Sequence, residues 1–101
     1  MPVNWVISQQ YGNEEKIQVV HQLDKAIEIL KSLESHPNPL KYVEVSVTLT
    51  LEDGSQASFR LPEDIQLLDD YDLDKEAQVL HRLLEANPMF ELMWKSPMLI
   101  R

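Results

Sequence analysis

The chain has 101 residues, of which nine are basic and seventeen acidic, and its formal net charge is −8. This length supports one domain with one hydrophobic core, and the lack of cysteine excludes disulfides and thiolate metal sites. Direct binding to nucleic acid or an anionic membrane is disfavoured, because both need clustered Lys and Arg. No apolar run approaches the roughly 18 to 20 residues of a bilayer span, and no signal peptide is recognisable, so we expect a cytoplasmic protein.

The N-terminal residues predict a strand followed by a long helix. Val3, Trp5 and Ile7 alternate with other residues, which indicates a strand over residues 3–11 that ends at Gly12-Asn13. Asn13 is a suitable helix N-cap, and acidic residues follow it, where the helix dipole favours them. The predicted helix covers residues 14–35 and ends before two prolines. Its apolar residues recur every three or four positions: Ile17, Val20, Leu23, Ile27 and Leu30.

The stretch 42–61 predicts a β-hairpin with a defined register. Five apolar residues alternate with polar ones between Tyr42 and Leu51, and a second alternating run ends at Leu61. A three-residue loop, Glu52-Asp53-Gly54, pairs Leu49 with Ala57 and Val47 with Phe59 on one apolar face, whereas a two-residue turn would mix the faces. Gly54 would then take the left-handed conformation of a G1 bulge.

Acidic residues dominate the next segment, where seven of fourteen residues from 63 to 76 carry a carboxylate. Apolar residues are interspersed among them, so we expect an ordered loop rather than a free tail. Asp72 or Asp74 would cap a helix to about Ala86 whose stripe is Leu73, Ala77, Leu80 and Leu84. Asn87-Pro88 predicts the restart of a short helix to about Lys95.

These elements predict an α+β fold in a single domain, residues 1–101. Residues 1–61 would form a β-α-β-β core, a three-stranded sheet with one long helix packed on the Val43/Val45/Val47 side. Residues 62–76 would be an acidic loop, and residues 77–101 a C-terminal helical pair with an apolar tail. The sequence leaves open whether the first strand pairs with residues 42–51 or with residues 55–61.

Motifs for catalysis or metal binding are weak. Asp70-x-Asp72-x-Asp74 resembles the opening of a calcium loop, but Lys75 stands where that loop needs glycine and His81 where it needs glutamate. The three histidines have no metal-ligand spacing. With two glycines in all, neither a phosphate-binding loop nor a dinucleotide fingerprint can be built. We therefore expect no enzyme activity, no cofactor and no metal site.

Two segments are candidate partner-binding surfaces. The first is the acidic loop, and its candidate residues are Glu63, Asp64, Asp69, Asp70, Asp72 and Asp74; the alternative interpretation is helix capping plus a solvated edge. The second is the apolar C-terminal segment, with candidates Met89, Phe90, Met93, Trp94, Met98 and Leu99. Methionine and aromatic residues are common at adaptable interfaces, but this segment could equally complete the core.

The sequence thus favours a non-catalytic, acidic protein-binding module whose partner is another, basic protein. In size, charge and lack of cysteine it resembles small inhibitors, immunity proteins and phage anti-defence proteins, a likeness of class that implies occupation of a basic groove of the partner. One alternative is a structural or assembly adaptor that forms a homodimer through its apolar C-terminal segment. A third is a small protein that binds a divalent metal through Asp70, Asp72 and Asp74.

Overall fold

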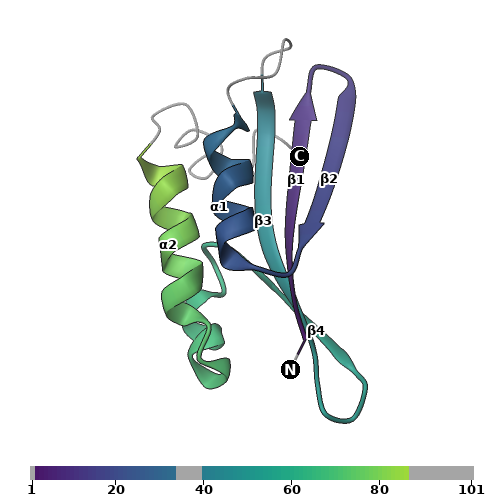
Figure 1. Cartoon of the computed structure of the whole chain (residues 1–101), viewed down its shortest axis with the longest axis vertical. Helices are drawn as coiled ribbons and strands as arrows, with labels where there is room; N and C mark the ends of the chain where they lie inside the picture. The colour runs from purple at the N-terminus through teal and green to yellow at the C-terminus, as the bar shows by residue number, and fades with distance from the viewer. Residues whose placement is uncertain (1, 34–39, 87–101) are drawn as a thin grey trace.

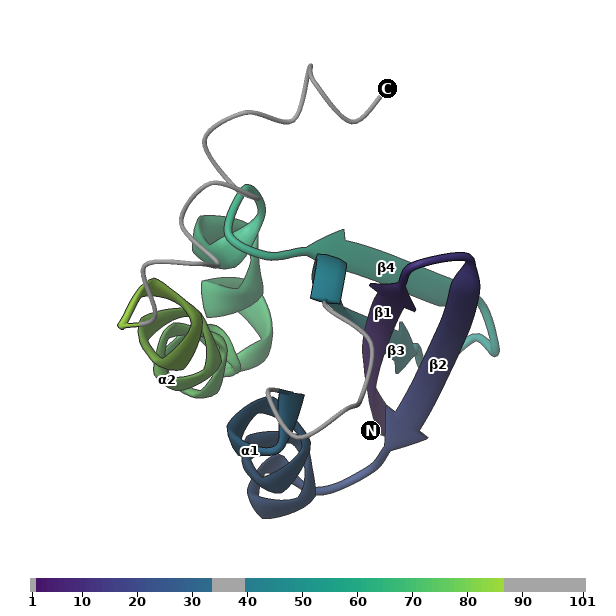
Figure 2. The same cartoon turned by 90° about the horizontal axis from the view of Figure 1, so that it is seen from above.

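The computed structural model describes residues 2–33 and 40–86. The elements in these ranges are β1 (Val3–Tyr11), β2 (Glu14–Val20), α1 (Leu23–Lys31), β3 (Leu40–Thr50), β4 (Gln56–Arg60), the 3-10 helix η2 (Ile65–Tyr71) and α2 (Asp74–Glu85). The strands form one antiparallel sheet in the order β2-β1-β3-β4. The helices lie on one side of that sheet (Figures 1 and 2). The α+β class is therefore confirmed, and the predicted three-stranded sheet is wrong by one strand.

The fourth strand is β2, which occupies the start of the predicted long helix. It pairs with β1 in a hairpin whose turn is Gly12-Asn13, with Tyr11 opposite Glu14. Gly12 has φ +61, while Asn13 is not among the positive-φ residues, which is the pattern of a type II′ turn. Asn13 is therefore a turn residue and not a helix cap. The helix α1 begins only at Leu23, and its N-cap residue Gln22 makes no side-chain capping bond.

The second hairpin has the predicted register. Leu49 pairs with Ala57 and Val47 with Phe59. The Leu61 N–H also donates to the Val45 carbonyl at 2.9 Å. The three-residue loop is confirmed, because the Gly54 N–H donates to the Leu51 carbonyl at 2.9 Å and Gly54 has φ +87.

The first strand pairs with β3, which settles the choice left open by the sequence. Trp5 lies opposite Val47 and Ile7 opposite Val45, and all four side chains are buried. These odd-numbered residues face α1 and α2, because Ala26 and Leu30 of α1 join the same core as Leu80 and Leu84 of α2. The core therefore lies between one sheet face and a helical layer. Even-numbered residues of β1 and β3 point to the opposite face.

The helix after the acidic segment has the predicted stripe. Leu73, Ala77, Leu80 and Leu84 are all buried, and α2 ends at Glu85, close to the predicted Ala86. Neither Asp72 nor Asp74 caps it: the N-cap position is Leu73, with no side-chain capping bond, and Asp74 is in the first turn. The predicted helix over residues 88–95 lies outside the described residues. None of the helices in the described ranges has the length and apolarity that a bilayer span needs.

Candidate functional site

The acidic segment is a folded layer rather than a loop. Residues 65–71 form η2, which packs against α2 and β4. Leu68 is fully buried and Leu73 is 8% exposed, so these two side chains anchor the segment in the hydrophobic core. The ring of Tyr71 lies 5.6 Å from that of Phe59, centroid to centroid, at an interplanar angle of 52°. The expectation of an ordered segment anchored by its apolar residues is confirmed, and only its helical form was missed.

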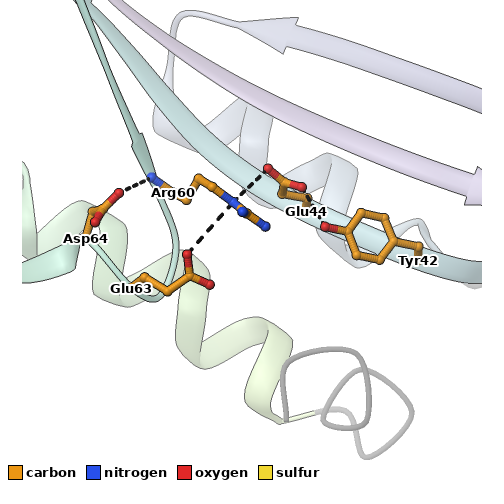
Figure 3. A network of polar contacts seen from close by, with 5 residues as sticks. All are labelled: Tyr42, Glu44, Arg60, Glu63 and Asp64. Carbon is orange, nitrogen blue, oxygen red and sulfur yellow. Dashed lines mark hydrogen bonds and ion pairs between the residues drawn. The ribbon is translucent and has the colours of Figure 1, made fainter. Parts of the chain in front are cut away.

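The entry to this layer is held by a network of polar contacts around Arg60 (Figure 3). The Arg60 N–H donates to a carboxylate oxygen of Asp64 at 2.9 Å, and the Asp64 N–H donates to the Arg60 carbonyl at 2.8 Å. Arg60 Nε lies 3.1 Å from a carboxylate oxygen of Glu44 and 3.9 Å from one of Glu63. The backbone therefore makes a reciprocally bonded turn as it leaves β4.

The charge of this network is partly balanced within the protein. Glu44, with a smaller contribution from Glu63, raises the pKa of Arg60. The Tyr42 hydroxyl donates to Glu44 at 2.6 Å. Burial, together with this carboxylate, raises the pKa of Tyr42. Of the predicted acidic candidates, Asp64 therefore has a structural role, and Glu63 lies near a cation that partly neutralises it.

Three other candidates form what we call the acidic surface: Asp69, Asp70 and Asp72, together with Leu67. All four residues are exposed, and Leu67 is 54% exposed. No Lys or Arg of the described residues lies within ion-pair distance of the three carboxylates. Asp72 has φ 58, a left-handed conformation that aspartate tolerates better than most residues. This turn holds Asp72 where η2 ends, close to the other two acids.

Asp74 lies at the margin of the acidic surface. It is half-buried in the first turn of α2, where the helix dipole favours a carboxylate. It also lines a shallow hollow of about 270 Å³ together with Ile65, Gln66, Asp69 and Gln78. Within the described part of the chain, no group of three or more His, Cys, Asp or Glu residues is arranged to hold a metal ion. The metal-binding alternative therefore gains no ligand cluster from Asp70, Asp72 and Asp74.

The apolar C-terminal candidates cannot be placed in the same way. Met89, Phe90, Met93, Trp94, Met98 and Leu99 all lie outside the described residues. Whether that segment completes the core or forms an interface stays a prediction.

The sequence interpretation missed one exposed apolar region, on β2. Ile17 is 58% exposed and Val19 53% exposed, although the helical interpretation placed Ile17 on a buried stripe. The signals that would have found the strand are the β-branched residues Ile17, Val19 and Val20 and the glycine-containing pair Gly12-Asn13 between two strand-like runs.

Comparison with protein-family models, with curated proteins and with solved structures finds no match to this chain.

Proposed function

We propose that this protein is a non-catalytic binding module that uses the acidic surface to hold a basic region of another protein. The observation that carries the proposal is that Asp69, Asp70 and Asp72 are exposed on an anchored helical segment and have no cation partner among the described residues. Residues 63–76 contain seven acids and one lysine, a net charge of −6, whereas the whole chain carries −8. Six of the eight net negative charges thus lie in fourteen residues.

The arrangement favours recognition over simple solubility for a physical reason. A carboxylate on a mobile tail loses conformational entropy when it binds, whereas Asp69, Asp70 and Asp72 extend from a layer that Leu68 and Leu73 already fix. The exposed Leu67 lies in the same helix and adds an apolar contact, so that a partner can bury surface as well as neutralise charge. In its most specific form, the module is an inhibitor that occupies a basic groove otherwise used for nucleic acid.

A titration of the isotope-labelled protein with a deca-lysine peptide, followed by amide NMR shifts, tests this proposal. At low salt we expect the largest shifts over residues 66–74, and we expect them to weaken steeply as salt is added. The variant Asp69→Asn/Asp70→Asn/Asp72→Asn should lose most of the binding. A matched control, Asp24→Asn/Glu28→Gln/Glu52→Gln, removes the same number of exposed charges elsewhere and should retain it.

Equal weakening in the two triple variants, or shifts spread over all surface carboxylates, would show that net charge alone attracts the peptide. That result would overturn the proposal, because a defined site requires these three carboxylates to outweigh the others. With a partner in hand, the same variants should slow association more than they speed dissociation.

A further inference from the structure

The free edge of β2 is the second region with the character of a binding surface. In the order β2-β1-β3-β4, β2 and β4 are the two edge strands. β2 has seven residues and packs mainly against β1, with a smaller contact to α1. An edge strand exposes unpaired backbone donors and acceptors that can bind another extended chain.

A hydrogen bond between β3 and the residue before β1 shows which backbone groups of β2 point away from the sheet. The Thr50 N–H donates to the Pro2 carbonyl at 3.2 Å, so even-numbered residues of the first strand direct their backbone groups toward β3. Antiparallel pairs alternate, so the odd-numbered residues of β1 bond to their partners in β2, which are even-numbered. The backbone N–H and C=O groups of Glu15, Ile17 and Val19 therefore point to the open edge.

The same three residues place their side chains on the outer sheet face. Val19 lies opposite Val6 and Ile17 opposite Ser8, and both strand neighbours are on the face away from α1 and α2. Ile17 and Val19 are more than half exposed. Glu15, two residues before Ile17, is exposed and has no cation partner among the described residues.

We propose that this edge binds an extended peptide segment of a partner protein by antiparallel strand addition. The segment has the pattern apolar–x–apolar–x–basic, read from its N-terminus. Its two apolar residues lie opposite Val19 and Ile17, and its Lys or Arg lies opposite Glu15. Main-chain hydrogen bonds to Glu15, Ile17 and Val19 supply affinity, and the alternate side chains supply specificity.

A second copy of this chain fits the edge less well. Symmetric pairing centred on Ile17 places Glu15 of each copy opposite Val19 of the other, which leaves both carboxylates without a cation. Pairing of Ile17 with Val19 places Glu15 opposite His21, beyond the end of β2 and outside the apolar pairs. It would also bring together two chains that each carry a net charge of −8. A basic segment supplies the missing charge, which is why we assign the edge to a different chain.

The probe is a capped seven-residue peptide, Thr-Ile-Thr-Val-Thr-Lys-Thr, titrated into the labelled protein and followed by NMR shifts and amide hydrogen exchange. We expect saturable binding, with new exchange protection at the amides of Glu15, Ile17 and Val19 and none over residues 66–74. The same peptide N-methylated at the amides that face β2 should show no detectable binding. It keeps all its side chains but has lost the backbone N–H donors that strand addition requires.

Two protein variants distinguish strand addition from simple attraction. Glu15→Lys should weaken binding of the lysine peptide roughly two- to fivefold, as expected when an exposed ion pair is lost. A peptide with Glu in place of Lys should recover the lost affinity. Ile17→Thr/Val19→Thr should weaken the binding of both peptides. The control Leu67→Thr removes an exposed apolar residue from the acidic surface and should change the binding of neither peptide.

Several results would overturn the inference. One is the absence of shifts at millimolar peptide, and another is unchanged binding after N-methylation. A third is protection of these three amides in the peptide-free protein together with a dimeric mass by light scattering, which would show that a second copy occupies the edge. Shifts confined to residues 66–74 would mean that the lysine peptide binds only through charge. The triple-aspartate variant tests the acidic surface separately, so failure of the edge proposal and failure of the proposed function can be distinguished.

Discussion

The two edges of the sheet differ in how they are protected. β4 has five residues, its outward side chains Gln56, Ser58 and Arg60 are polar, and the chain turns directly from it into η2. β2 has seven residues and exposes Ile17 and Val19. Short length, polar side chains and a covering element are the usual means of protecting an edge from unwanted pairing. Among the described residues, the β4 edge is therefore short, polar and partly covered, whereas the β2 edge is longer and exposes apolar side chains.

The difference also separates the two proposed surfaces. The acidic surface belongs to the layer next to β4, since η2 packs on β4 and α2. The open edge is at the other end of the strand order (Figure 2). Because β1 and β3 lie between β2 and β4, each surface can be altered without direct contact with the other. Substitutions in η2 and in the β3–β4 hairpin test how strongly the β4 side of the sheet is held in place.

The largest effect is expected at the anchor of the covered edge. Leu68→Ala removes a fully buried side chain that fastens η2, and we expect a loss of about 3 kcal/mol in the free energy of unfolding, measured with urea. Leu67→Ala, one position away and exposed, is the matched control and should stay within about 0.5 kcal/mol. In Leu68→Ala, amide exchange should become faster first over residues 56–71. An equal increase across β2 would show that η2 does not unfold separately from the rest of the sheet.

A middle-sized effect is expected at the turn that leads into β4. Gly54 has φ +87, and a Cβ there would meet no atom within 4 Å, so the cost of a side chain is conformational rather than steric. Gly54→Ala should destabilise the protein on the order of 1 kcal/mol. Gly54→Asn should cost less, since asparagine tolerates the left-handed region. Equal losses in thermal unfolding for the two variants would contradict this backbone explanation.

A smaller, pH-dependent effect is expected from Tyr42. Its pKa is raised in the fold by burial and by the Glu44 carboxylate. The stability that this pKa shift contributes is therefore fully present below the unfolded-state pKa of about 10. It is lost as the pH rises through the higher pKa of the folded state. Tyr42→Phe should flatten the loss of stability above about pH 10, measured by urea unfolding at each pH. Tyr11, whose pKa burial also raises, should leave a residual slope.

The smallest effect is expected at Asp53, in the loop before β4. The hydroxyl and the backbone N–H of Ser55 donate to this carboxylate at 2.6 and 3.0 Å, and they lower its pKa. Ser55→Ala should move that pKa back toward the ordinary aspartate range, as read by an NMR titration of the carboxyl carbon. No movement would mean that the side-chain bond is not formed in solution. Any stability that Asp53 adds is present above the unfolded pKa and lost as pH falls through the folded value.

The two hairpins show which strand pairings a sequence pattern can predict and which it cannot. The β3–β4 hairpin was predictable because one face is buried, so a slip by one residue would expose Val47 and Leu49, and only a three-residue loop ending at Gly54 fits that register. The β1–β2 hairpin was not recognised, because Ile17, Val20 and Leu23 also have the spacing of a helical stripe. In the structure Ile17 and Val20 point to opposite faces of β2, Ile17 is exposed, and Leu23 begins α1.

The acidic candidates divide in a way that composition could not reveal. Sequence alone grouped Asp64 with Asp69, Asp70 and Asp72, since all lie in one acidic stretch. The structure separates them, because the turn after β4 brings the Asp64 carboxylate to the Arg60 N–H, while η2 directs the other three away from any described cation. Which carboxylates remain unpaired depends on the path of the backbone, not on their number.

The sequence by itself determined the elements whose local pattern and burial agree: β1, the register of the β3–β4 hairpin, and the buried stripe of α2. Alternation or helical spacing is decisive there because the apolar residues are also the ones that enter the core. Only the tertiary structure decided the fate of residues 14–20. Their pattern is compatible with helix or strand, and pairing with β1 satisfies backbone groups of β1 that would otherwise be unpaired, which moves the open edge to β2. The open edge of β2 therefore emerged from the assembly of the sheet, which no local pattern contains.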